Sequence, residues 1–132
     1  MLIGVPKEIK DNEFRVGLTP SSVAELVHHG HQVWVERSAG IGSGLPDSEY
    51  AQAGAILVDG QDDIFARAEM IVKVKEPLAA EREKLRRGQV LFTYLHLAPD
   101  LEQTKDLIAS GATCIAYETV TSPHGGLPLL TP

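Results

Sequence analysis

The chain has 132 residues, of which 43% are hydrophobic and 23% charged, enough for one compact core in a single domain over residues 1–132. A formal net charge of -6 provides no positive field for nucleic acid or for an anionic membrane surface, so we expect neither as a partner. The single cysteine, Cys114, excludes an internal disulfide and a cysteine-based metal cage, and its apolar surroundings predict a small buried residue.

The first predicted element is a buried strand over residues 2–5, which Pro6 ends. This apolar run is too short for a signal peptide or a membrane-spanning helix, so we expect a cytoplasmic protein. A polar loop over residues 7–18 leads to a helix that ends before Gly30. Thr19 and Pro20 are suited to the N-cap and first position of this helix, and a slightly later start would instead use the capping box of Ser22 and Glu25.

The rest of the chain alternates short apolar runs with helical stretches. Further strands are predicted over residues 33–35, 55–58, 70–74, 90–94 and 113–116. Helices are predicted over residues 48–53, 62–68, 78–86 and 101–110, and a loose apolar tail over residues 127–130. Consecutive runs lie too far apart for hairpins. The pattern therefore predicts an α/β fold, a mostly parallel, Rossmann-like or flavodoxin-like sheet with helices on both faces.

Polar side chains follow the predicted strands where the strands end. Arg15 lies in the loop after the first strand, Lys75 follows the strand over residues 70–74, and Glu118 follows the last strand. Ligands of open parallel sheets bind beyond the carboxyl ends of the strands, so these side chains could converge there. An arginine and a lysine suit a small carboxylate. The alternative is a set of solvated loop ends, since strands often end in charged residues.

His96 is a candidate for proton transfer, because histidine titrates near neutral pH. It lies between Leu95 and Leu97, directly after a mostly apolar strand, so we expect it to be partly buried at the sheet edge. The alternative is a buried histidine that one backbone hydrogen bond satisfies.

Two other motifs do not predict a ligand site. His28, His29 and His31 lie at a helix end, point to different faces and have no carboxylate partner pattern, so we expect no metal. The glycines over residues 40–44 only superficially match a dinucleotide loop. The third glycine of that motif would fall at Leu45, and Pro46 interrupts the helix that should follow, so a tight mobile turn is the better interpretation.

The motifs together resemble those of the alanine dehydrogenases along the whole chain. They are LIGVPKEIKDNEFR (2–15), RVGLTP (15–20), GIGSG (40–44), VKVKEP (72–77), LFTYLHL (91–97), AYETV (116–120) and LPLLTP (127–132). In that family the enzyme interconverts L-alanine and pyruvate with NAD and releases ammonia, and it has two α/β domains and is commonly a hexamer. The resemblance implies a substrate-binding domain for pyruvate or L-alanine.

The resemblance also implies roles for particular residues. Arg15 and Lys75 would hold the substrate carboxylate, His96 would be the acid/base, and Lys75 could also position or activate water. Tyr94 and Glu118 are weaker substrate-binding candidates, since the tyrosine could cap the core and the glutamate could be a structural hydrogen-bonding partner. No NAD-binding residue is expected within the chain.

Two departures from the family pattern concern the substrate loop: Phe14 stands where a small or polar residue is usual, and Gly17 replaces an alanine, which leaves the loop's flexibility open. Family members also continue past this length into a dinucleotide-binding domain and return with C-terminal helices. We therefore expect a fragment that is inactive alone and that self-associates through uncovered apolar surface. The alternatives are a transhydrogenase-type nucleotide-binding domain, which the Lys75 and His96 motifs disfavour, and a non-catalytic self-associating module.

Overall fold

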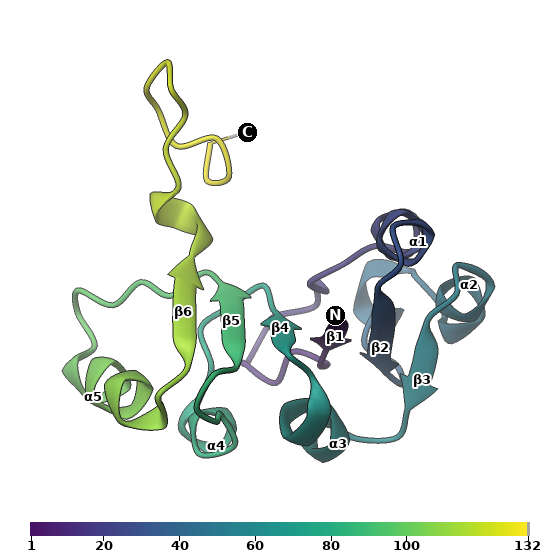
Figure 1. The fold of residues 1–132 in the computed structure, drawn as a ribbon, viewed down its shortest axis with the longest axis horizontal. Coiled ribbons are helices and arrows are strands. Elements are labelled where there is room, and N and C mark those ends of the chain that lie inside the picture. The colour runs from purple at the N-terminus through teal and green to yellow at the C-terminus, as the bar shows by residue number, and fades with distance from the viewer. Residues whose placement is uncertain (132) are drawn as a thin grey trace.

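The computed structural model describes residues 1–131, which form one six-stranded sheet flanked by helices (Figure 1). The strands are β1 (Leu2–Val5), β2 (Gln32–Glu36), β3 (Ile56–Val58), β4 (Met70–Val72), β5 (Val90–Thr93) and β6 (Thr113–Ala116). All pairings are parallel, in the order β3-β2-β1-β4-β5-β6. The prediction of a parallel α/β sheet is confirmed, and the strand order is that of a Rossmann-like fold.

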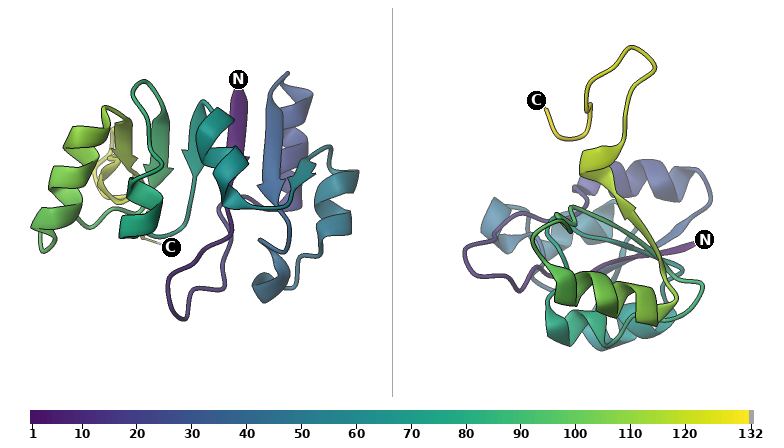
Figure 2. Two further views of the ribbon diagram at one scale, coloured as in Figure 1. Left: turned by 90° about the horizontal axis from the view of Figure 1, so that it is seen from below. Right: turned by 90° about the vertical axis from the view of Figure 1, so that its left-hand side faces the viewer.

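Five helices connect the strands and cover both faces of the sheet (Figure 2). They are α1 (Pro20–His28), α2 (Asp47–Gln52), α3 (Gln61–Arg67), α4 (Ala79–Arg82) and α5 (Leu101–Ser110), with short 3-10 turns η1 (Ile41–Ser43) and η2 (Tyr117–Thr119). Helices α1 and α2 pack on one face, in a core that includes Val23 and Tyr50. On the other face the core includes Ile64 and Phe65 of α3 and Leu107 of α5.

The start of α1 follows from its capping residues. The Thr19 side chain accepts a hydrogen bond from the Ser22 amide at 3.3 Å, and Pro20 occupies the first helical turn. The cap satisfies an amide that the first turn leaves unpaired, and proline there loses no hydrogen bond. The earlier of the two predicted starts is therefore the one adopted.

Two predicted elements are shorter than expected. Strand β4 ends at Val72 instead of residue 74, and α4 covers only Ala79–Arg82 of the predicted 78–86. The Lys73 amide still donates to the Phe92 carbonyl of β5 at 3.0 Å, but the Val74 amide donates to the Glu8 carboxylate of the site described below, so the pairing with β5 stops there. Beyond Arg82 the chain turns toward β5.

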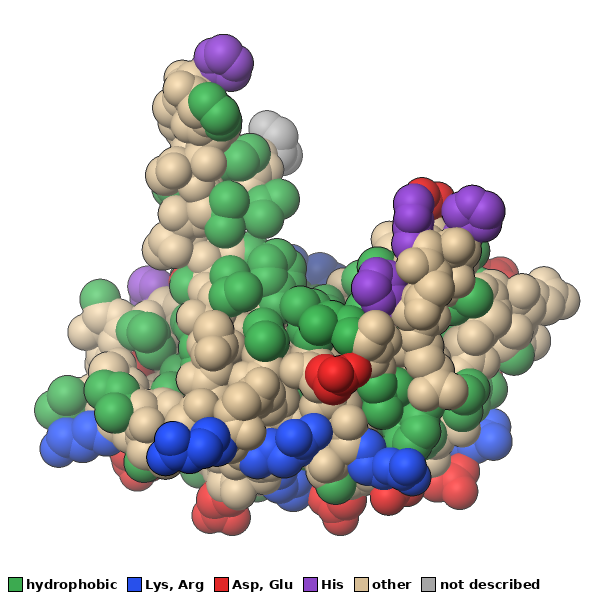
Figure 3. All heavy atoms as spheres, viewed as in Figure 1, with side chains coloured by type: hydrophobic (Ala, Val, Ile, Leu, Met, Phe, Trp, Pro, Cys, Tyr) green, Lys and Arg blue, Asp and Glu red, His purple; other side chains and the backbone are tan. Residues whose placement is uncertain are grey.

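Half of one sheet face carries no helix. Beside α1, hydrophobic side chains gather in the hollow below the segment that follows β6 (Figure 3). A cavity of about 300 Å³ there is lined by residues that include Val72, Phe92, Tyr117 and Leu129. Of the helices in residues 1–131, none has the length and apolarity that a membrane crossing requires.

Candidate functional site

The site lies at the carboxyl ends of β1 and β4, which are neighbours in the sheet although their connections run to opposite sides. Such a switch point opens a crevice in parallel sheets, because the loops diverge there. The loop after β1 brings Arg15 to this place and the segment after β4 brings Lys75. A cavity of about 310 Å³, which we call the cationic pocket, is lined by Arg15, Lys75, Tyr94, Tyr117, Leu129 and Leu130.

The backbone of Lys75 is fixed from both sides. The Glu8 carboxylate accepts hydrogen bonds from the amides of Val74 at 3.2 Å and Lys75 at 3.0 Å. The Thr93 hydroxyl donates to the Lys75 carbonyl at 2.8 Å, and the Tyr117 hydroxyl donates to the Val74 carbonyl at 2.9 Å. Burial raises the pKa of Tyr117, so its hydroxyl keeps the proton that this bond requires. The ammonium of Lys75 is thus presented from a rigid backbone.

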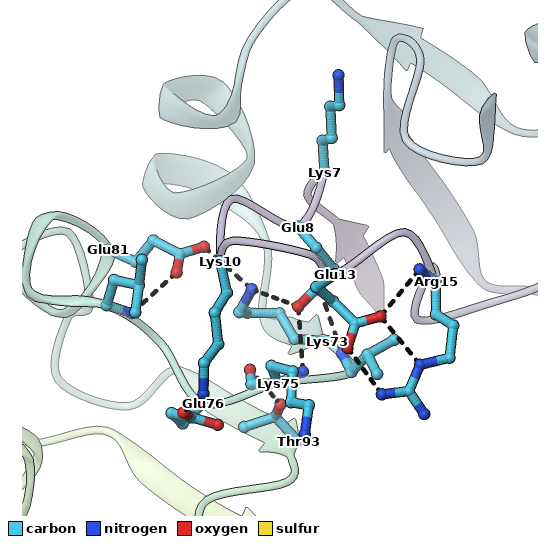
Figure 4. A network of polar contacts seen from close by, with 12 residues as sticks. Lys7, Glu8, Lys10, Glu13, Arg15, Lys73, Lys75, Glu76, Glu81 and Thr93 are labelled. Atoms are coloured by element: carbon cyan, nitrogen blue, oxygen red, sulfur yellow. Dashed lines mark hydrogen bonds and ion pairs between the residues drawn. The ribbon is translucent and has the colours of Figure 1, made fainter. Parts of the chain in front are cut away.

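Beneath this segment lies a buried cluster of charges (Figure 4). The Lys73 ammonium lies 3.2 Å from the Glu8 carboxylate and 3.0 Å from that of Glu81, and each of the three side chains is at most 2% exposed. Glu81 also accepts the amide of Leu78 at 3.0 Å at the start of α4. Because buried charges are costly unless paired, these three residues act as a unit that ties the loop after β1 to the segment after β4.

Arg15 is held by a neighbouring carboxylate. Its Nε and Nη2 atoms donate to the two oxygens of Glu13 at 2.9 and 2.7 Å, and its backbone amide donates to the same group at 2.9 Å. Hydrogen bonds from the Arg15 side chain lower the pKa of Glu13 from 4.5 to about 2, and the charge of Lys75 acts in the same direction. The carboxylate therefore stays ionised and the pair stays intact at any ordinary pH.

Tyr94 connects the pocket to His96. Its ring lies 5.0 Å from the Lys75 ammonium, within the range of a cation–π contact, and stacks on the His96 ring at 5.6 Å between centroids. The histidine does not line the cationic pocket itself but adjoins it through this stack. The sequence left open whether Tyr94 caps the core. In the structure its side chain is half-buried and lines the pocket.

His96 is exposed, and the expectation of partial burial is wrong. Its backbone adopts φ of 48°, a left-handed conformation that non-glycine residues seldom take, and this turns the side chain out of the sheet edge. The Glu118 carboxylate compensates by accepting the amides of Leu95 at 3.1 Å and His96 at 2.7 Å. Glu118 thus holds the histidine loop through its backbone.

The sequence alone assigned no role in the site to Glu8, Lys73 or Glu81. It assigned none to Glu13, Tyr117 or the two leucines of the tail either. Spacing could not reveal the contacts of Glu8, because its partners Lys73 and Val74 are 65 and 66 residues away along the chain. A signal existed for Glu13, since an acid two residues before an exposed arginine can fold back onto it.

The remaining motifs form no ligand site that the structure reveals. His29 pairs with Glu25 at 3.0 Å, and the His31 ring meets the amino group of Met1. Across residues 1–131 no three potential metal-ligating residues cluster. The glycine loop folds into η1 and not into a helix N-terminus, so it does not fit a dinucleotide pyrophosphate.

Other sequence expectations concern packing. Cys114 is half-buried, less than predicted, and burial raises the pKa of its thiol. A Cβ at Gly17 would lie 2.5 Å from the Val72 carbonyl oxygen, so this part of the loop packs directly on β4 and has no room for a side chain. Phe14 is 64% exposed.

Comparison with known proteins gives consistent results. Residues 4–132 match the family described as alanine dehydrogenase/PNT, N-terminal domain. The chain is 56% identical over its full length to an alanine dehydrogenase of Halomonas elongata and 52% identical to one of Mycobacterium tuberculosis, and it spans 36% of the length of each.

Solved structures show the same likeness. An L-alanine dehydrogenase superposes with a TM-score of 0.95 at 58% identity, over 98% of this chain and 36% of that one. A transhydrogenase from Sinorhizobium meliloti superposes with a TM-score of 0.84 at 34% identity, over 89% of this chain and 35% of that one.

Proposed function

The chain belongs to the alanine dehydrogenase/PNT N-terminal domain family, and on that premise we propose that it is the substrate-binding part of an NAD-dependent L-alanine dehydrogenase. The reaction converts L-alanine, NAD and water to pyruvate, ammonia and NADH. The observation that carries the proposal is the cationic pocket, where Arg15 and Lys75 come from separate elements and face one cavity. Two such cations suit one small carboxylate.

Each site residue then has a physical task. Arg15 offers a planar pair of donors to the substrate carboxylate, and Lys75 adds a point charge on the other side. Tyr94 covers the pocket next to Lys75, and His96 holds or releases a proton at the substrate's reacting end. Glu118 fixes the position of the His96 backbone and does not line the cationic pocket.

When bound, NAD would accept the hydride, and the residues of this chain would bind and orient the organic acid. The transhydrogenase likeness supports a second candidate, a nucleotide-binding domain, because an arginine and a lysine suit a phosphate as well as a carboxylate. The enzyme would be a homo-oligomer that acts on L-alanine or pyruvate.

A titration of the 132-residue chain with pyruvate, followed by NMR, tests the proposal. We expect saturable shifts at the amides of residues 74–76 and 94–96, and their loss in Arg15→Ala and Lys75→Ala. The exposed Arg87→Ala serves as control, since it removes the same charge away from the pocket. Equal binding by Arg15→Ala and the unaltered chain would refute the carboxylate site.

A second test uses an active alanine dehydrogenase that contains this domain. There, His96→Ala should lower kcat for NADH oxidation with pyruvate and ammonium.

A further inference from the structure

The contact between Glu13 and Arg15 uses one edge of the guanidinium. Nε and Nη2 donate to the carboxylate, so the protons of Nη1 and the second proton of Nη2 remain free on the neighbouring edges. A guanidinium has five donor protons in a plane, and two carboxylates can bind it at different edges. The edge that Glu13 leaves open is the one that a substrate carboxylate can use without displacing it.

Burial shows which partner of the pair is fixed. The Glu13 side chain is only 6% exposed, whereas that of Arg15 is 64% exposed. The carboxylate also lines a second cavity, of about 410 Å³, that it shares with Arg15 and with Ser38 and Gly42, and it does not line the cationic pocket. Glu13 therefore holds the arginine from the side away from the pocket, and Figure 4 shows it between Arg15 and the buried cluster.

The glycine loop after β2 supports this arrangement. The Ser43 hydroxyl donates to the Phe14 carbonyl at 2.8 Å, and a Cβ at Gly42 would lie 2.9 Å from the Phe14 Cβ. Only glycine allows so close an approach without moving the substrate loop. The GIGSG motif thus packs against Phe14, the residue next to Arg15.

We propose that Glu13 is a positioning residue that orients the Arg15 guanidinium for a substrate carboxylate, with Gly42 and Ser43 bracing its loop. This inference rests on the proposed function, since it concerns the same pocket. It differs from the opposite possibility, in which the Glu13 carboxylate occupies the place of the substrate and competes with it. The two make opposite predictions for a variant that removes the charge of Glu13 and keeps its shape.

The first test needs no ligand. The Nε–H resonance of Arg15 in the 132-residue chain should be shifted and protected from solvent exchange relative to that of the exposed Arg87. Glu13→Gln should abolish the protection, and Glu102→Gln, which removes an equal charge from the exposed surface of α5, should leave it intact. Equal exchange at Arg15 and Arg87 in the unaltered chain would overturn the inference.

The second test is pyruvate affinity. Glu13→Gln should weaken binding about tenfold, the loss expected when a hydrogen-bonded charge pair that fixes a side chain is broken. Ser43→Ala, which leaves the pocket untouched, should weaken it by a smaller factor. Binding as tight as, or tighter than, that of the unaltered chain in Glu13→Gln would overturn the inference. If Arg15→Ala loses binding while Glu13→Gln keeps it, only the inference fails; if Arg15→Ala keeps binding, the proposed function fails.

Discussion

Substitution of Lys73 by methionine tests the buried charge cluster most directly. Methionine has a similar length and no charge. Lys73→Met therefore leaves the carboxylates of Glu8 and Glu81 without their cation, and each of these side chains is at most 2% exposed. Breaking a buried pair in this way typically costs about 3 to 5 kcal/mol, because the remaining charges have neither solvent nor a counter-ion. For a domain of this length the loss corresponds to about 11 to 18 °C in Tm.

Thermal unfolding followed by circular dichroism measures the effect. Lys84→Met is the matched control, since its ion pair with Asp62 lies at the surface, where Asp62 is 85% exposed. This pair should contribute at most about 1 kcal/mol. The triple substitution Glu8→Gln, Lys73→Met, Glu81→Gln should recover most of the stability, because no unpaired charge remains. A shift in Tm no larger for Lys73→Met than for Lys84→Met would show that the cluster is hydrated and would refute the reasoning.

Three further outcomes are expected. Folding lowers the pKa of Glu13 to about 2, so its pair with Arg15 stabilises the fold above the unfolded-state pKa. This stabilisation is lost as the pH falls toward 2. The fall of Tm with decreasing pH should therefore be shallower for Glu13→Gln than for the unaltered chain. Tyr50→Phe should lower the free energy of unfolding in urea by about 1 to 2 kcal/mol, since the buried hydroxyl donates to the Leu18 carbonyl at 2.7 Å. Glu118→Ala should speed hydrogen exchange at the His96 amide and weaken pyruvate binding, and unchanged exchange would contradict the role of that carboxylate.

The pattern of apolar runs was sufficient to predict the sheet. All six strands and five helices were expected within a few residues, because buried parallel strands and capped helices leave local signatures such as Thr19-Pro20. The shortening of β4 was not predictable, since the apolar pattern continues to Val74 while the backbone there is held by Glu8 from another part of the chain. Local sequence does not indicate which distant side chain accepts hydrogen bonds from the backbone amides at the end of a strand.

The candidate site was likewise predictable only where local sequence determines the structure. Strand-end logic predicted that Arg15 and Lys75 converge, because parallel strands bring their carboxyl ends to one edge, whereas Tyr94 was a candidate only through the family resemblance. It failed for the burial of His96, since apolar neighbours indicate burial only when the backbone continues in an extended conformation. The left-handed turn at His96 depends on Glu118, a tertiary contact across 22 residues.

The placement of acids explains how a chain of net charge -6 can present a cationic pocket. Glu13 and Glu8 lie behind the cationic residues, where they bind the side chain of Arg15 and the backbone of Lys75, and neither lines the pocket. Each acid lowers the cost of holding a cation in place while leaving donors free on the pocket side. A carboxylate entering the pocket therefore meets positive charge although the surrounding chain repels anions. The preference for a carboxylate follows from the direction in which each charged side chain points. The Glu13 and Lys73 substitutions perturb the orientation of Arg15 and Lys75 without adding or removing any group that lines the pocket.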